Sequence, residues 1–176
     1  TIAQRYGCPA IIADPVGVDE FPGIARFSGW KEIERKSFSH ALNLRARARR
    51  AAVQIGVEFE RSRFIGIHLG GGISVAAIDG GKIIDVNNSN EDGPFTPQRT
   101  GGLPVLQLVD LCFSGKHSDA EEVKRLLVKA GGLVSYLGTD DVREILDRIE
   151  SGDADAKSVV DAMLYQIAKE AGAMAS

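Results

Sequence analysis

The sequence predicts an α/β fold in which three antiparallel strands are followed by a series of helices. The apolar residues 64–69 run into three consecutive glycines, and a second apolar segment, residues 73–78, follows them. A further turn, Asp79-Gly80-Gly81, leads into residues 82–86, and such a turn needs the positive φ that glycine adopts without steric cost. After residue 103, apolar residues recur at helical spacing. The pattern therefore predicts a strand meander that precedes helices.

The glycines at residues 70–72 form the candidate ligand-binding turn of this meander. A turn of this composition can hold its residues at positive φ and lets other atoms approach the backbone without interference from Cβ atoms. Its successive N–H groups can converge on a phosphate. The sequence is neither the GxGxxG nor the GxxxxGKS/T motif, and a hairpin whose turn is merely rich in glycine is the alternative. Three antiparallel strands with such turns suit an actin-like or ribonuclease-H-like ATPase.

Five segments of the chain resemble the acetate kinase family of acyl kinases, and within it the members that act on butyrate. These segments are IIADPVGVDEFPGIARFSGWKEIERKSFSHALN, HLGGGIS, DVNNSNEDGPFTPQRTGGLPVLQLVDLCFSGK, KAGGLVSYLGTDDVREILDRIESGDADAK and AMLYQIAKEAGAMAS. The resemblance implies the actin-like fold that acetate and sugar kinases share with heat-shock chaperones and actin. Members of the family are longer at both ends, so we expect a central fragment. Residues 1–60 would end the first actin-like domain with a connecting helix, and residues 61–176 would form the second without its C-terminal part.

The resemblance also implies an activity. Such an enzyme transfers the γ-phosphoryl of ATP, with Mg²⁺, reversibly to the carboxylate of butyrate, giving butyryl phosphate and ADP. Isobutyrate, propionate and acetate stay open as alternative acceptors, because spacing cannot rank the residues of an acyl pocket. A different class of protein, a non-catalytic nucleotide-binding module like an actin or chaperone core, is the second alternative. The isolated fragment is expected to be inactive, since a two-domain cleft would be cut.

Composition and charge restrict the class of partner. The chain has 44% hydrophobic and 26% charged residues, which is typical of a folded globular protein. A net charge of −3 gives no drive toward nucleic acid or membranes, and no apolar run approaches the roughly 18 residues of a membrane span. Cys8 and Cys112 lack the spacing of a zinc site. We expect a cytoplasmic protein, a homo-oligomer, whose partners are a short-chain carboxylic acid and ATP.

Asp14 is the first candidate site residue. The apolar residues 10–13 predict a strand that ends at Asp14-Pro15, and catalytic groups of α/β sheets commonly lie where strands end. An aspartate that merely initiates a turn before proline is the alternative. The resemblance implies an active-site aspartate that orients the attacking carboxylate and, indirectly, the metal-bound phosphate.

His40 lies near the start of a helix predicted from about residue 38 to residue 56. The basic run on this helix, Arg45 to Arg50, is interpreted as a solvated face. The resemblance implies that His40 stabilises the phosphoryl group during transfer, although Phe38-Ser39-His40 departs from the adjacent Phe-His pair of the family. Either a neutral or a charged imidazole could supply the hydrogen bond.

The second phosphate loop of the family corresponds to residues 68–74. The resemblance implies that ATP phosphates contact the glycine turn, with Ser74 adding a hydroxyl; the candidate residues are His68, Leu69, Gly70, Gly71, Gly72 and Ser74. A buried histidine whose ring is satisfied by backbone carbonyls is the alternative for His68.

Arg99 ends a polar segment, residues 85–100, whose prolines and turn-forming residues exclude the interior of a strand. A surface loop is the simpler interpretation, but its place after the meander suits the rim of an active site. A guanidinium grips a carboxylate or phosphate with two parallel hydrogen bonds. The resemblance implies that Arg99 is the arginine that stabilises the transition state.

Four helices are predicted in the remainder of the chain. The first spans residues 103–113, and the last spans residues 153 to about 175. The second begins at a capping box of Ser118 with Glu121 and ends at residue 129. The third begins at a cap of Thr139 or Asp140 and ends at residue 149. On the last helix, Val159, Met163 and Ile167 form an apolar stripe that Val160, Leu164 and Ala171 widen.

Overall fold

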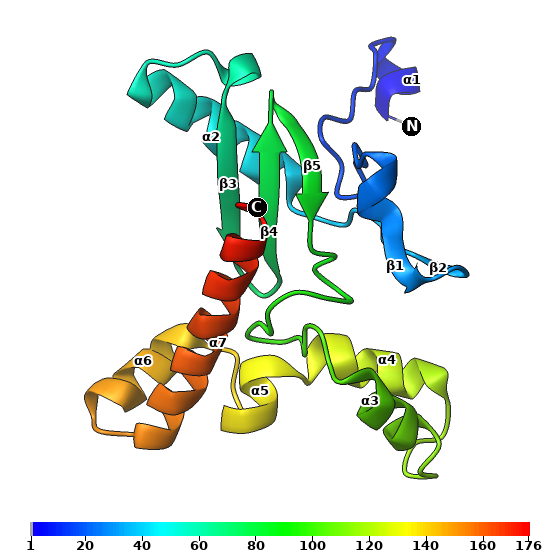
Figure 1. Ribbon diagram of the computed structural model, residues 1–176, viewed down its shortest axis with the longest axis vertical. Helices are drawn as coiled ribbons and strands as arrows, with labels where there is room; N and C mark the ends of the chain where they lie inside the picture. The colour runs from blue at the N-terminus through cyan, green and yellow to red at the C-terminus, as the bar shows by residue number, and fades with distance from the viewer. Residues whose placement is uncertain (1) are drawn as a thin grey trace.

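The computed structural model describes residues 2–176, and its centre is a three-stranded antiparallel sheet (Figure 1). The strands are β3 (Arg63–Leu69), β4 (Ile73–Asp79) and β5 (Lys82–Val86), in the order β3-β4-β5. Leu69 pairs with Ile73 across the first turn, and Asp79 pairs with Lys82 across the second. Gly80 and Gly81 have φ values of 56° and 82°, as the hairpin requires. The predicted meander is confirmed.

One face of the sheet is covered by helix α2 (Ala41–Ile55). The helix buries Ala41, Leu44, Ala48 and Ala52, which recur every three or four residues, against Ala76 and Ile78 of β4. Phe21 and Phe59 belong to the same core. This core spans the predicted domain boundary between residues 60 and 61, and the division into two actin-like domains stays a prediction.

The opposite face of β4 packs on the C-terminal helices. Ile73 and Val75 point away from α2, because side chains of a strand alternate. They meet α5 (Gly132–Leu137), α6 (Val142–Glu150) and α7 (Ala154–Ala173), which lie on this side and below the sheet (Figure 1). Met163 and Ile167 are buried as predicted. Leu164 is half-exposed and lies outside the core, so the prediction that it widens the buried stripe is wrong.

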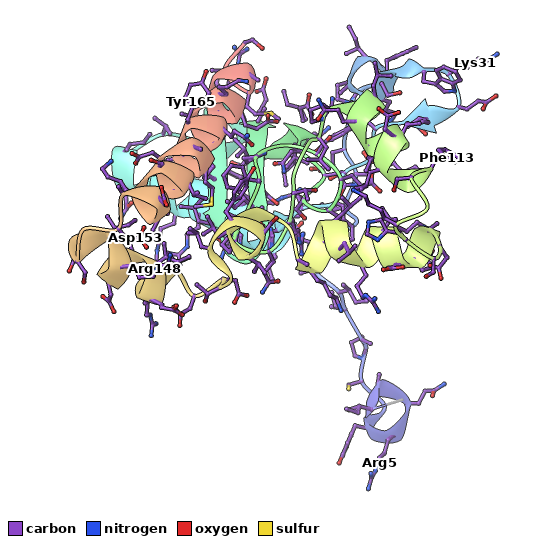
Figure 2. The ribbon with its side chains drawn as sticks, turned by 90° about the horizontal axis from the view of Figure 1, so that it is seen from below. Arg5, Lys31, Phe113, Arg148, Asp153 and Tyr165 are labelled. Carbon is purple, nitrogen blue, oxygen red and sulfur yellow. The ribbon has the colours of Figure 1, made fainter. Side chains whose placement is uncertain are left out.

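The helix caps differ in detail from those predicted. Helices α3 (Val105–Cys112) and α4 (Ala120–Lys129) continue the chain after the polar segment. The N-cap of α4 is Asp119, whose side chain accepts from the N–H of Glu122, so the predicted pair of Ser118 and Glu121 is wrong by one position. Ser118 instead donates its hydroxyl to the Glu122 carboxylate. Asp141 and Asp153 cap α6 and α7, and the Asp153 carboxylate also lies 2.8 Å from Arg148 (Figure 2).

Residues 2–40 contain little regular structure. They hold the short helix α1 (Ile2–Tyr6), which lies apart from the rest (Figure 2), and a hairpin of β1 (Phe27–Trp30) and β2 (Ile33–Glu34). Short 3-10 turns, η1 (Gly23–Arg26) and η2 (Phe59–Arg61), precede β1 and β3. The strand predicted at residues 10–13 is absent, and Ile11 and Ile12 are exposed. An apolar run becomes a strand only where a neighbouring strand accepts its hydrogen bonds, and the described residues supply none here.

None of the helices in residues 2–176 is long and apolar enough to cross a lipid bilayer.

Candidate active site

Two histidines from different elements stack on each other. His40 is the N-cap residue of α2, and His68 lies near the end of β3. Because α2 packs across β3, the two rings meet with their centroids 3.8 Å apart and an angle of 11° between their planes. Burial lowers the pKa of His40, and the neighbouring His68 and Arg99 lower it further. Burial also lowers the pKa of His68. Both rings are therefore neutral at neutral pH.

Ser74 contacts one histidine of this pair through its hydroxyl. It lies opposite His68 in the register of β3 and β4, and it is fully buried. Its Oγ lies 2.9 Å from Nδ1 of His40 and accepts the backbone N–H of His40 at 3.4 Å. The predicted hydroxyl of Ser74 thus contacts a histidine of the site.

The glycine turn serves close approach rather than unusual backbone geometry. Gly70, Gly71 and Gly72 do not have positive φ, so that part of the prediction is wrong. The three residues between Leu69 and Ile73 complete the hairpin without left-handed conformations. A Cβ on Gly72 would lie 2.7 Å from Nη1 of Arg99, and a Cβ on Gly70 would lie 3.1 Å from Nε2 of His68. Because glycine has no side chain, Gly72 leaves room for the guanidinium of Arg99 and Gly70 leaves room for the imidazole of His68.

Arg99 is held against this turn by the backbone and side chains of the polar segment. Thr96 is buried, donates to the carbonyl of Gly71 at 2.6 Å and accepts the N–H of Arg99 at 3.0 Å. Nη1 of Arg99 donates to the carbonyl of Ser89 at 2.6 Å. Its Nε is buried and has no partner among the described residues. Burial lowers the pKa of Arg99, but a guanidinium stays charged in proteins. An unused, buried N–H on a fixed cation is suited to an anion.

The polar segment is irregular, as predicted, but it is not an exposed rim. Asn87, Asn88 and Ser89 are buried. The Asn87 side chain accepts the N–H of Val75 at 2.6 Å and donates to the carbonyl of Ile73 at 3.0 Å, so it continues the sheet where β5 stops. Sequence reasoning missed this role, because an asparagine in a loop and an asparagine that replaces a strand look alike in one sequence.

Asp92 is a partly buried carboxylate in the same segment, and its buried oxygen Oδ1 has no hydrogen-bond partner among residues 2–176. Burial raises its pKa to about 6; Arg35 opposes this shift, while Glu170 and Glu91 add to it. The folded state therefore binds more protons than the unfolded state between about pH 4 and pH 6, and the free energy of unfolding falls as the pH rises through this range.

We expect Asp92→Asn to raise the free energy of unfolding at pH 8 by about 1–2 kcal/mol, after allowance for the solvent that reaches the group. Near pH 4, where Asp92 is protonated, the gain should disappear. Denaturant titrations of the whole protein at both pH values test this, with Asp110→Asn, an exposed position on α3, as the control. A variant that is less stable than the original protein at pH 8 would contradict the assignment.

A cavity of about 620 Å³ opens beside His40 and brings Asp14 to the same site. Asp14 has a φ of 42°, a conformation that aspartate tolerates better than most residues. Polar and apolar side chains line the cavity, including Asn43, Arg47, Val16 and Leu42. Asp14 and His40, which the sequence placed on different elements, therefore face one space.

Arg45 holds Asp14 in place. Its Nη1 lies 3.3 Å from Oδ1 of Asp14, and its Nη2 lies 2.6 Å from Oε2 of Glu20. The interpretation of the basic run as a solvated face is wrong for Arg45, whose side chain is only 20% exposed, whereas it holds for Arg49 at 59%. The helical spacing of the arginines could have separated inward from outward positions, but the acidic partners come from a distant loop.

No group of three or more potential metal ligands occurs within residues 2–176. Asp14 supplies the carboxylate in the lining of the cavity beside His40. A metal that also binds substrate oxygens needs only one or two protein carboxylates.

Comparisons with known proteins agree on one family. Residues 33–176 match the model of the acetokinase family. The chain is 53% identical over 99% of its length to a protein named probable butyrate kinase 2 from Caldanaerobacter subterraneus, and 52% identical over 98% to a probable butyrate kinase from Thermotoga petrophila. It covers 49% and 48% of those proteins. The chain thus spans about half the length of the curated relatives it matches.

Solved structures give the same result for the fold. The acetate kinase of Porphyromonas gingivalis superimposes with a TM-score of 0.77 at 27% identity, over 89% of this chain and 41% of that one. A propionate kinase from Francisella tularensis gives 0.76 at 23% identity, over 88% of this chain and 42% of that one. These likenesses confirm the predicted actin-like ATPase fold.

Proposed function

This chain belongs to the acetokinase family, and we propose that the whole protein transfers the γ-phosphoryl of ATP reversibly to the carboxylate of butyrate, giving butyryl phosphate and ADP. The observation that carries the proposal is the convergence of His40, His68 and Arg99 on the glycine turn. The relatives that are 53% and 52% identical to this chain are named probable butyrate kinases, which favours butyrate as the acceptor.

The donors of this site suit a phosphoryl group in transfer. In such a reaction the protein aligns donor and acceptor and neutralises the charge that spreads over the phosphoryl oxygens. Arg99 offers a buried Nε–H that has no partner among the described residues. Its Nη1 donates to the carbonyl and the hydroxyl of Ser89, and these contacts keep the guanidinium in place. His40 would donate a second hydrogen bond, and the N–H groups of Gly70 to Gly72 would hold the ATP phosphates beside it.

The cavity next to His40 is suited to the acid. Its wall is largely apolar, with Val16, Leu42 and Ala46, and Arg47 also lines it. A short alkyl chain would pack on this wall while its carboxylate faces Asp14 and His40. A carboxylic acid is already ionised at neutral pH, so Asp14 has no proton to remove and its role is to orient the acceptor.

Asp14 is also the residue that would face Mg²⁺, indirectly through water, because the cation binds mainly to phosphate oxygens in such sites. When bound, the ion would neutralise charge on the phosphates. Arg45 keeps the carboxylate of Asp14 at the cavity rather than turned into solvent. We further propose a cytoplasmic homo-oligomer built from two actin-like domains, with neither nucleic acid nor membrane as a partner.

A hydroxylamine trap tests the proposal. The whole protein, ATP and Mg²⁺ are incubated with acetate, propionate, butyrate, isobutyrate or no acid, and the hydroxamate formed from any acyl phosphate is measured. Hydroxamate that peaks with the four-carbon acids is the expected result, and the ratio of butyrate to isobutyrate chooses between them. ATP binding without hydroxamate from any acid would contradict an acyl kinase and favour a nucleotide-binding module.

A further inference from the structure

The hydroxyl of Ser74 has a single hydrogen, and the structure restricts where that hydrogen points. Ser74 is fully buried on β4. Its oxygen already accepts the backbone N–H of His40 at 3.4 Å. The second contact of Oγ is Nδ1 of His40, at 2.9 Å. No other hydrogen bond of the Ser74 hydroxyl is present in the described part of the chain, so Nδ1 is the one acceptor available to it.

The two possible directions of this contact differ in cost. If Nδ1 carried a hydrogen and donated it, the buried hydroxyl hydrogen would lose its acceptor, and a buried donor without a partner is destabilising. If the hydroxyl donates to Nδ1, the hydroxyl, the ring nitrogen and the backbone N–H are all satisfied. In a neutral imidazole the ring hydrogen then lies on Nε2. A charged imidazole carries hydrogen on both nitrogens and has the same defect as the first arrangement.

The surroundings of His40 also favour the neutral ring. Its face lies 3.8 Å from the ring of His68, so two charged imidazoles would repel each other at contact distance. The guanidinium of Arg99 lies near enough to add to this effect, and burial acts in the same direction on the pKa of His40. Since Nδ1 faces the buried Ser74, the Nε2 edge is the part of the ring left for the cavity that His40 lines.

We propose that Ser74 is a positioning residue: its hydroxyl donates to Nδ1 of His40 and selects the neutral tautomer with its hydrogen on Nε2, which then donates to the oxygens of the transferred phosphoryl group. This inference rests on the proposed function. It resolves the choice between a neutral and a charged donor that the sequence leaves open. It also gives a reason for a buried polar residue within an otherwise apolar stretch of β4.

Nitrogen NMR of the whole protein with ¹⁵N-labelled histidine tests the tautomer directly. The signals of His40 are those that disappear in His40→Asn. The expected spectrum shows Nδ1 without hydrogen and Nε2 with hydrogen at pH 8. In Ser74→Ala the two tautomers should mix, and kcat should fall about tenfold, as is usual when the partner that orients a catalytic histidine is removed. The KM values for ATP and the acid should stay within about twofold of the original, because Ser74 touches neither substrate.

Two variants complete the test. Ser158→Ala, on α7, removes a hydroxyl that bonds only within its own helix, and it should change neither the spectrum nor kcat. Ser74→Thr keeps the hydroxyl and should retain the Nε2–H tautomer, so it separates the hydrogen bond from packing at this buried position. A hydrogen on Nδ1 in the original protein, or full kcat in Ser74→Ala, would overturn the inference while the kinase activity stands. An original protein that forms no acyl phosphate would overturn both.

Discussion

Arg99→Ala is expected to lower kcat about 100- to 1000-fold, the usual effect of removing one fixed donor that stabilises transition-state charge. The guanidinium is held by Ser89, and its Nε–H is buried without a partner. Alanine would remove both the charge and this donor while the loop keeps its anchor through Thr96, because that anchor uses the backbone of residue 99. Steady-state rates of acyl phosphate formation measure the loss.

Two further arginine variants make this result specific. Arg99→Lys keeps a positive charge but cannot form the two parallel hydrogen bonds of a guanidinium, so it should recover only a small part of the rate. Arg61→Ala removes an arginine at the end of η2 whose side chain is 81% exposed, and it should leave the rate unchanged. Full turnover by Arg99→Ala would remove the main support for the assigned roles.

Gly72→Ala is expected to lower kcat about 100-fold, because displacing a catalytic group by about 1 Å has effects of this size. The backbone of Gly72 is not in a left-handed conformation, so alanine fits the turn itself. Its Cβ would nevertheless lie 2.7 Å from Nη1 and 2.9 Å from Cζ of Arg99. The loss should therefore come from displacement of the guanidinium, with little change in unfolding temperature.

A double variant separates this cause from general damage to the turn. If Gly72→Ala acts through Arg99, the double variant with Arg99→Ala should be no slower than Arg99→Ala alone, since the side chain that is displaced is already absent. Gly172→Ala, in α7, places a Cβ where nothing lies within 4 Å and should be neutral. Additive losses in the double variant would show that Gly72 acts independently of Arg99.

The parts of the fold that depend on local pattern were predictable. The meander of β3, β4 and β5 follows from apolar runs separated by glycine turns. Helices α2, α3, α4, α6 and α7 appear near their expected positions, because apolar spacing and capping residues act over a few neighbours. The short helix α5 was not predicted. The cap of α4 moved by one residue to Asp119, since serine and aspartate are almost equally good caps.

The parts that depend on distant partners were not predictable. Residues 10–13 have the composition of a strand, but residues 2–176 supply no neighbouring strand with which they could pair. Arg45 is one arginine in a basic run until Asp14 and Glu20 fold onto it. The contact between Ser74 and His40 joins a strand to a helix N-terminus. Each depends on tertiary contacts that a single sequence does not contain.

The candidate site also contains some residues that could be chosen from local sequence and others that could not. The glycine turn and its neighbours His68 and Ser74 could be chosen as a local group, although the reason for the glycines is clearance for Arg99 and not positive φ. His40 was chosen from the resemblance, and Arg99 from the resemblance together with its place at the end of the polar segment. The structure brings both to the glycine turn. The roles given to these residues stay predictions until variants are measured.

The most direct test of the central claim is to follow oxygen-18 from butyrate labelled in both carboxylate oxygens. The whole protein is supplied with ATP, Mg²⁺ and the labelled acid, and hydroxylamine then cleaves the product at its carbonyl carbon. If a carboxylate oxygen attacks the γ-phosphorus of ATP, that oxygen becomes the bridging atom of the acyl phosphate and leaves with the phosphoryl group. The account predicts inorganic phosphate that carries one oxygen-18 atom, together with ADP. Label in AMP would indicate attack on the α-phosphorus, unlabelled phosphate would indicate hydrolysis of ATP by water, and either result would contradict an acyl kinase.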